Sequence, residues 1–255
     1  MQTIRASAIL ATFLVVTVIL MPVQGLGVVL DLGYARKLPH AYHRFVAGLF
    51  GIHIRVVGDP VRDRGVLLLA NHTSWLDIVI FSAVMPLSFV AKSEVAAWPF
   101  FGWLARLQRT VFVARARRSE TGQVRDVIRQ RLVKGEALVL FPEGTSGDGN
   151  AVLSFKSALL GAAAGEEAVT VQPVSAAYTG LHGIPMGREN RPLFAWYGDM
   201  ELVPHLWEAL KAGPLDAVVE FHPPLAQADR KQLAQQAEKL VREGHVRALA
   251  GHSVT

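Results

Sequence analysis

An uncharged apolar segment near the start of the chain constrains the fold more than any other feature. Residues 6–30 contain no charged side chain and consist largely of alanine, leucine, valine and isoleucine. As a helix, this segment would be about 37 Å long, whereas the hydrocarbon core of a bilayer is about 30 Å thick. The segment is therefore long enough to cross a membrane, and part of the protein is expected to face lipid.

Three arrangements of this segment are compatible with its residues. It can span the membrane, or it can turn back as a re-entrant or monotopic hairpin with the next helix, because Pro22, Gly25 and Gly27 predict a kink or break near its end. A cleaved signal peptide is the third arrangement, although residues 23–25 match a small-x-small cleavage site poorly. The length of the apolar run favours an anchor over a cleaved leader.

The segment after the apolar run has the pattern of an amphipathic helix. In residues 34–53, apolar side chains alternate with basic ones, which is typical of a helix at a membrane interface, and Pro39 fits only near its first turn. An ordinary helix packed against a core is the alternative. Basic residues after the apolar run outnumber those before it, with Arg36, Lys37 and Arg44 against Arg5. The positive-inside tendency therefore predicts a bacterial inner-membrane protein whose globular part faces the cytoplasm.

Composition narrows the chemistry further. Apolar residues make up 51% of the chain and charged residues 18%, which is more apolar than an average soluble domain. The chain has no cysteine, which excludes disulfides, thiolate catalysis and cysteine-ligated zinc. The formal net charge is +5, but the basic residues gather near the membrane segment and near Arg115, without a motif that reads nucleic acid. Anionic lipid head groups are therefore the expected partners, and nucleic acid is not.

Beyond the anchor, short β-rich runs alternate with helical stretches. The expected strands are residues 66–70, 87–91, 110–113, 137–141, 169–177, 194–197 and 217–221. The expected helices are residues 74–84, 119–134, 155–164, 204–212 and 228–249. This alternation predicts an α/β fold with a mixed, largely parallel sheet flanked by helices, preceded by the N-terminal membrane-embedded helical segment.

A histidine and an aspartate follow the first of these strands, with four residues between them. An imidazole oriented by a carboxylate can take a proton from a hydroxyl near neutral pH, so His72 and Asp77 are candidates for general-base catalysis. The alternative is a helix start, because Ser74 and Asp77 have the spacing of a capping box. Both interpretations can hold together, since α/β folds expose reactive groups where a strand ends and a helix begins.

Two further clusters follow later strands. The loop at residues 142–149 contains Glu143, Gly144, Thr145 and Ser146, whose backbone N–H groups and hydroxyls could hold an anion, although such residues also make ordinary turns. Arg115 directly follows the expected strand at 110–113 and is a candidate for binding phosphate or carboxylate. The neighbouring Arg117 and Arg118 are expected to be solvated.

Four short motifs in this order resemble those of the glycerolipid acyltransferases, which include the 1-acylglycerol-3-phosphate acyltransferases and their lysophospholipid relatives. They are Asn-His-x-Ser-x-x-Asp at 71–77, Val-Phe-Val-x-Arg at 111–115, Phe-Pro-Glu-Gly-Thr at 141–145 and Val-x-Pro-Val at 171–174. The resemblance is clear over residues 65–178 and weaker towards both ends. It divides the chain into a membrane anchor with its interfacial helix at 1–58 and an acyltransferase domain at 59–255.

The resemblance implies a mechanism. His72 would deprotonate the hydroxyl of a lysolipid, Asp77 would orient and stabilise the imidazole, and the hydroxyl oxygen would attack an acyl thioester without an acyl-enzyme. The donor would be acyl-CoA or acyl carrier protein, and no cofactor or metal is implied. The family also assigns acceptor binding to residues 143–145 and the anionic head group to Arg115. Lys92 matches a family block beside the site, but its role stays open.

Two departures from the family pattern affect the choice of acceptor. Phosphatidic-acid-forming members commonly carry Arg-Ser after the threonine of the third motif, whereas this chain has Ser-Gly-Asp-Gly at 146–149. That sequence is more similar to the branch that acylates lyso-ornithine lipid, in which Asp148 could pair with an ammonium group. Lysophosphatidic acid and lyso-ornithine lipid both remain candidates. Arg109 stands where a glycine often begins the second motif, which leaves the local backbone in question.

Two other functional classes compete with acyl transfer to a lysolipid. A thioesterase would use the same base to activate water, and a noncatalytic lipid-binding membrane protein would have no chemical need for the His72 and Asp77 pair. An acidic acyl carrier protein could dock on Arg125, Arg129 and Arg131 of the next helix, although a solvated helix face is the more ordinary interpretation.

Overall fold

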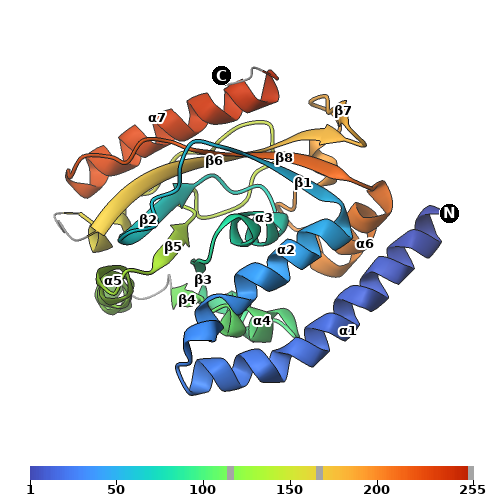
Figure 1. Cartoon of the computed structure of the whole chain (residues 1–255). Helices are drawn as coiled ribbons and strands as arrows, with labels where there is room; N and C mark the ends of the chain where they lie inside the picture. The colour runs from blue at the N-terminus through green and yellow to red at the C-terminus, as the bar shows by residue number, and fades with distance from the viewer. Residues whose placement is uncertain (114–117, 165–168, 252–255) are drawn as a thin grey trace.

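The computed structural model describes residues 1–113, 118–164 and 169–251, together forming one twisted sheet between two layers of helices (Figure 1). The strands are β1 (Ile52–Val57), β2 (Gly65–Ala70), β3 (Ser88–Lys92), β4 (Val111–Val113), β5 (Ala137–Leu140), β6 (Val169–Leu181), β7 (Ile184–Pro185) and β8 (Leu215–Phe221). Their order in the sheet is β1-β8-β6-β2-β5-β3-β4, with β7 paired to β6. Only the pairs β6–β8 and β6–β7 are antiparallel among the described strands, so the prediction of a mixed, largely parallel sheet is confirmed.

The helices cover both faces of the sheet because the central strand is apolar on both sides. They are α1 (Gln2–Val29), α2 (Leu38–Phe50), α3 (Leu76–Val84), α4 (Phe101–Leu107), α5 (Arg118–Val133), α6 (Leu202–Ala212) and α7 (Arg230–Leu249), with short 3-10 turns η1 (Gly33–Arg36), η2 (Ser93–Ala97), η3 (Leu160–Ala162) and η4 (Arg191–Leu193). Val66 and Leu68 of β2 join the core formed with α2, α3 and α6, whereas Leu67 and Leu69 join the core formed with α5 and α7. Alternate side chains of one buried strand thus hold two helical layers.

Two predicted elements are absent, because their backbone groups bind other parts of the chain. The expected helix at 155–164 is a loop with a single 3-10 turn, since the N–H of Phe155 donates to Glu238 of α7. The expected strand at 194–197 is irregular, since the N–H of Trp196 donates to the carbonyl of Thr73. Tertiary contacts override local propensity in both segments. Conversely, β1 and α4 were not foreseen.

The N-terminal segment forms a helical hairpin beside the domain. Helix α1 continues through Pro22 without the predicted break, and Figure 1 shows its axis bending before the chain returns as α2. Arg5 donates to the carbonyl of Leu210 in α6 (2.9 Å), and Gln24 donates to that of Leu107 in α4 (2.8 Å). By length and composition α1 could cross a membrane, yet only 17% of its most apolar window is buried. Helices α1 and α2 form a hairpin, and both the spanning and the monotopic arrangements in a membrane stay predictions.

Helix α2 packs against the core, and its position at a membrane interface stays a prediction. Pro39 lies in its first turn, as predicted, and Val46 and Phe50 are buried in the core, while Arg44 and Phe45 on its other face are exposed. Strand β1, which the sequence assigns to the anchor, pairs in parallel with β8 and so belongs to the sheet. The division of the chain at residue 58 stays a prediction.

The departure at Arg109 has a backbone explanation. Arg109 follows the C-terminus of α4 with φ of +59°, a left-handed conformation that glycine adopts without strain and that explains the family glycine at this place. Its carbonyl accepts a hydrogen bond from Arg131, and its guanidinium lies 2.9 Å from Glu136. These contacts hold the arginine in a conformation that a side chain disfavours.

Candidate active site

The parallel strands place the motif loops at one edge of the sheet. Strand β2 pairs with β5 from Val66 opposite Ala137 to Leu69 opposite Leu140, and β5 pairs with β3 in the same direction. The carboxyl ends of parallel strands meet at one edge, where open α/β sheets bind ligands. The loops that follow β2 and β5 therefore lie together.

The catalytic candidates are in direct contact. The Nδ1 atom of His72 lies 2.8 Å from Oδ2 of Asp77, and the Asp77 side chain is completely buried, whereas that of His72 is 20% exposed. The imidazole stacks on the ring of Phe141 with centroids 4.1 Å apart. Strand β2 ends just before the histidine, and α3 begins just before the aspartate, so the turn between them brings the two side chains together.

Four donors compensate the buried carboxylate of Asp77. Oδ2 accepts from the backbone N–H groups of Thr73 (2.7 Å) and Ser74 (3.0 Å) and from His72, while Oδ1 accepts from the hydroxyl of Tyr178 (2.7 Å). Burial, reinforced by the charge of Asp77, raises the pKa of Tyr178 well above its usual value, so the phenol stays neutral and donates. A buried anion needs such donors to remain charged.

These contacts fix the tautomer of the histidine. Asp77 accepts hydrogen bonds, so Nδ1 of His72 carries the proton and Nε2 is left with its lone pair. Nε2 has no hydrogen-bond partner among the described residues. The arrangement provides a base next to a carboxylate that stabilises the protonated imidazole.

The capping-box alternative is half right. The carboxylate of Asp77 accepts the N–H of Ser74, which is the return half of a capping box, but the hydroxyl of Ser74 makes no cap. The same oxygen that closes the turn also binds His72. The contact that begins helix α3 and the contact between His72 and Asp77 are therefore made by the same carboxylate oxygen.

Tyr178 and Asn71 are the functional candidates that sequence reasoning missed. Asn71 donates to the carbonyl of Ala176 (2.9 Å) and accepts from its N–H (2.8 Å), which fixes the start of the loop to β6. Tyr178 lies on the same strand. Asn71 was visible within its motif, whereas nothing near Tyr178 in the sequence signals a contact with a residue so distant along the chain.

Glu143 connects the loop after β2 with the loop after β5 by hydrogen bonds. It is 3% exposed, and its two carboxyl oxygens accept from the backbone N–H groups of His72 (2.9 Å) and Leu153 (2.8 Å). Burial raises the pKa of Glu143 to about 8, against these two hydrogen bonds, and the charge of Asp77 adds to the rise. Its contacts are structural, and contact with the acceptor stays a prediction.

The remaining residues of the loop contact the catalytic turn and the segment after β7. The N–H of Gly147 donates to the carbonyl of His72 (2.9 Å), and the hydroxyl of Ser146 donates to the carbonyl of Trp196. Gly144 has φ of +72°, where glycine is favoured, and Thr145 is exposed. The loop is therefore built onto the catalytic turn itself.

Asp148 lies in this loop next to basic residues. Burial alone would raise the pKa of Asp148, but hydrogen bonds from the N–H (2.9 Å) and side-chain amide (3.1 Å) of Asn150, together with the charge of Arg188, lower it. Arg191 in turn donates to the side-chain oxygen of Asn150 (3.1 Å). The loop thus presents an ionised carboxylate close to the catalytic turn.

The other predicted binding residues have different outcomes. Lys92 ends β3 opposite Val113 of β4, at the same edge of the sheet, and its side chain is exposed. Arg115, Arg117 and the side chain of Arg118 lie outside the described residues.

One suggested docking residue for an acyl carrier protein points inward. Arg131 binds Glu136 and the hydroxyl of Ser88, with only 15% of its side chain exposed, so it cannot form a docking surface. Arg129 is exposed and Arg125 is partly buried beside Gly161. Of the three suggested docking residues, Arg131 is therefore not available, and docking at the other two stays a prediction.

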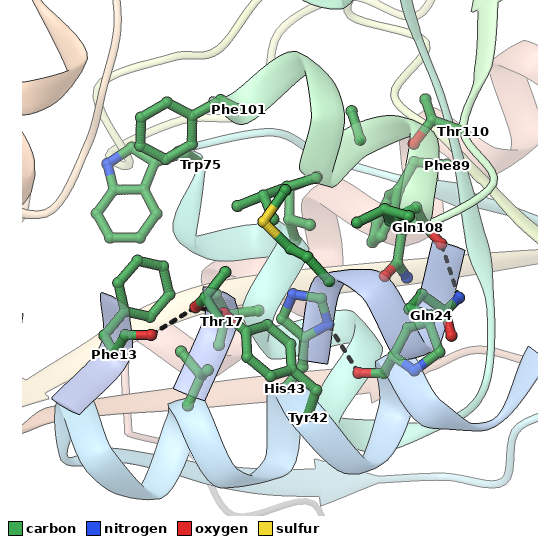
Figure 2. Close-up of a pocket in the computed structure, with 18 of the residues that line it drawn as sticks. Phe13, Thr17, Gln24, Tyr42, His43, Trp75, Phe89, Phe101, Gln108 and Thr110 are labelled. Carbon is green, nitrogen blue, oxygen red and sulfur yellow. Dashed lines mark hydrogen bonds between the residues drawn. The ribbon is translucent and has the colours of Figure 1, made fainter. Parts of the chain in front are cut away.

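An apolar cavity of about 230 Å³ lies beside the catalytic turn (Figure 2). Its lining comes mainly from α1, α2, α3 and α4, and it includes Trp75 of the catalytic turn. Phe89, also in the lining, stacks on Phe141 with centroids 6.2 Å apart, and Phe141 stacks on His72. The cavity therefore begins one aromatic ring away from the catalytic histidine.

Comparison with known proteins agrees with this geometry. Residues 53–177 match the family model described as Acyltransferase. The chain is 49% identical to a lyso-ornithine lipid O-acyltransferase from Brucella abortus, covering 99% of this chain and 98% of the relative. The chain belongs to the acyltransferase family. It is an enzyme of acyl transfer, as the resemblance of its motifs implied.

Two further relatives and one solved structure are similar to this acyltransferase. A lyso-ornithine lipid O-acyltransferase from Rhizobium meliloti is 45% identical over 93% of this chain and 85% of the relative. A 1-acyl-sn-glycerol-3-phosphate acyltransferase from Neisseria gonorrhoeae is 35% identical over 64% of this chain and 61% of the relative. The crystal structure of the 1-acyl-sn-glycerophosphate acyltransferase from Thermotoga maritima covers the whole chain with a TM-score of 0.69 and 22% identity, which shows a shared fold.

Proposed function

We propose that this acyltransferase moves a fatty acyl group from a thioester donor to the free hydroxyl of lyso-ornithine lipid. The contact between His72 and Asp77 carries the chemical part of the proposal. Similarity over nearly the full length to two enzymes with that name supports the acceptor.

His72 performs both proton transfers in the proposed reaction. Its Nε2 takes the proton of the acceptor hydroxyl while the oxygen attacks the thioester carbonyl carbon. Asp77 stabilises the imidazolium that forms. When the tetrahedral intermediate collapses, the carbon–sulfur bond breaks and the proton passes to the thiolate, which yields an ester, a free thiol and neutral histidine. No step requires a cofactor or metal.

The apolar cavity would hold an acyl chain during this reaction. Its walls are almost entirely hydrophobic, and it begins beside the ring of Phe141 on which His72 stacks. Such a site stabilises a chain by removing its methylene groups from water, about 0.8 kcal/mol for each. The exposed apolar face of α1 lies on the same side, so substrates could enter from a lipid surface.

The acceptor would be read by the loop that contains Asp148. An ornithine head group carries an ammonium group, and the ionised Asp148 can pair with it. A phosphate acceptor would instead meet the negative charge of Asp148 in this loop. Arg188 offers a cation for the acceptor's carboxylate.

The apolar helix α1 supports association with a membrane. We propose that this membrane is the bacterial inner membrane and that the active site faces the cytoplasm. The donor in this proposal is either acyl-CoA or acyl carrier protein. Because Arg131 is turned inward, only Arg125 and Arg129 are left as suggested docking residues for acyl carrier protein.

Parallel assays of the purified enzyme test this proposal. With an acyl thioester, we expect transfer to lyso-ornithine lipid at a kcat/KM above that for lysophosphatidic acid, and Asp148→Asn should reduce the lyso-ornithine value about tenfold more than the other. Equal losses would remove Asp148 from acceptor recognition. Thiol release without acceptor would indicate a thioesterase, and binding without turnover would indicate a lipid-binding protein.

A further inference from the structure

Three polar side chains line one region of the otherwise hydrophobic cavity. They are Gln24 of α1, His43 of α2 and Gln108 after α4. In Figure 2, Gln24 and Gln108 lie on one side of the cavity, opposite Phe13, Trp75 and Phe101. The reaction proposed above uses none of these polar groups.

The donors of all three side chains are already bound to the protein. Gln24 Nε2 donates to the carbonyls of Ala35 (2.9 Å) and Leu107 (2.8 Å). Gln108 Nε2 donates to the hydroxyl of Ser82 (3.1 Å) and the carbonyl of Leu87 (3.0 Å). Both amides are therefore fixed with their oxygen atoms free to accept.

The His43 ring is also held by a hydrogen bond from its donor nitrogen. Its Nδ1 lies 2.9 Å from the carbonyl of Pro39, which can only accept, so Nδ1 carries the proton. Burial lowers the pKa of His43 to about 4, so the ring is neutral and Nε2 holds a lone pair. Figure 2 shows a dashed contact from one nitrogen of the His43 ring and none from the other.

Hydrogen bonds made by their donor atoms connect the three side chains. Nδ1 of His43 also lies 3.0 Å from the hydroxyl of Ser82, to which Gln108 donates, and Gln24 binds the residue next to Gln108. Within the described residues, no group donates to His43 Nε2, Gln24 Oε1 or Gln108 Oε1, and Gln24 Oε1 is fully buried. Because Gln24 Oε1 has no accessible surface, the acceptors that an occupant of the cavity can reach are His43 Nε2 and Gln108 Oε1, which we call the acceptor cluster.

Unmet acceptors in an apolar cavity favour one kind of occupant. Leaving a buried acceptor unpaired is costly, and an unsubstituted hydrocarbon chain offers it no hydrogen. A chain that carries a hydroxyl can donate to the acceptor cluster while its methylene groups fill the rest of the cavity.

We propose that the cavity binds a hydroxylated acyl chain, whose O–H donates to the acceptor cluster of His43 and Gln108. This specificity rests on the proposed function, because the cavity must hold an acyl chain. The chain could be that of the thioester donor or that of the lysolipid acceptor. Both offer the same hydroxyl chemistry, and the experiment separates them.

The test compares kcat/KM for hydroxylated and unsubstituted chains in the full-length enzyme. One arm uses acyl-CoA donors with a hydroxyl near the thioester, at mid-chain or at the chain end. The other arm places an extra hydroxyl on the acyl chain of the lysolipid. At one position in one arm we expect a preference of roughly fivefold, the factor that one neutral hydrogen bond supplies.

Variants locate the preference. His43→Phe and Gln108→Met each remove acceptors, and each should bring the ratio of the two kcat/KM values close to unity, so failure of one variant to fold leaves the other. Met21→Leu, an apolar change in the same lining, should keep the ratio of the unaltered enzyme.

Two results would overturn the inference. One is an active enzyme that prefers no hydroxylated chain at any position in either arm, which would mean that water satisfies the acceptor cluster. The other is a preference that survives in both acceptor variants. Absence of transfer from every donor would instead contradict the proposed function, so the two failures are distinguishable.

Discussion

The imidazoles of His72 and His43 are both oriented through Nδ1, but the group that each one contacts is different. His72 lies 2.8 Å from the carboxylate of Asp77, whereas His43 lies 2.9 Å from the carbonyl of Pro39. A carboxylate stabilises the protonated ring, while a carbonyl in an apolar wall does so much less, and burial lowers the pKa of His43 to about 4. The same orienting contact therefore gives a base in one place and a neutral acceptor in the other.

The largest expected effect comes from making the partner of His72 neutral, as the partner of His43 is. Asp77→Asn should reduce kcat by about a thousandfold or more, because the amide cannot stabilise the imidazolium and can favour the wrong tautomer. Steady-state kinetics with saturating donor measure the loss. Asp63→Asn, at an exposed carboxylate paired with Arg64, is the matched control and should keep full activity. If Asp77→Asn kept activity near that of the control, the contrast between the two histidines would have no catalytic meaning.

A smaller effect is expected from Tyr178, which donates to the far oxygen of Asp77. Tyr178→Phe removes one of the four donors to this carboxylate, and we expect kcat to fall about tenfold with little change in KM. Tyr34→Phe removes a hydroxyl whose hydrogen bond lies on the exposed α1–η1 hairpin and should leave both constants unchanged. A rise in KM without a fall in kcat would place Tyr178 in substrate binding instead.

The third expected effect concerns stability rather than rate, at the buried acid beside the dyad. Glu143 has a folded-state pKa of about 8, above its ordinary value of 4.5, so between these values the folded protein holds more protons than the unfolded chain. Its contribution is fully present below about pH 4.5 and is lost as pH rises through about 8, with a slope of at most about 1.4 kcal/mol per pH unit.

Thermal unfolding of Glu143→Gln between pH 5 and pH 8 measures this contribution. The variant cannot ionise at this position, so the Tm difference between the two proteins should shrink or reverse as pH rises. A constant difference over this range would show that Glu143 stays ionised and that its pKa is not raised in the folded protein.

Much of the fold was predictable, because its signals are local. Runs of apolar residues such as 66–70 and 137–140 are typical of buried strands, and their alternation with helices favours parallel pairing. Segments 155–164 and 194–197 were predicted wrongly, since their backbone groups bind Glu238 and Thr73 rather than their own neighbours. No local pattern carries that information.

The sequence by itself determined the apolar N-terminal helix, the α/β architecture, the acyltransferase family and the pairing of His72 with Asp77, because each depends on residues close together in the chain. Only the tertiary structure decided that Tyr178 from β6 completes the environment of Asp77, that Arg131 faces inward, and that the acceptor cluster lies in the cavity. These features join residues from distant elements, and their hydrogen-bond partners exist only once the layers have packed.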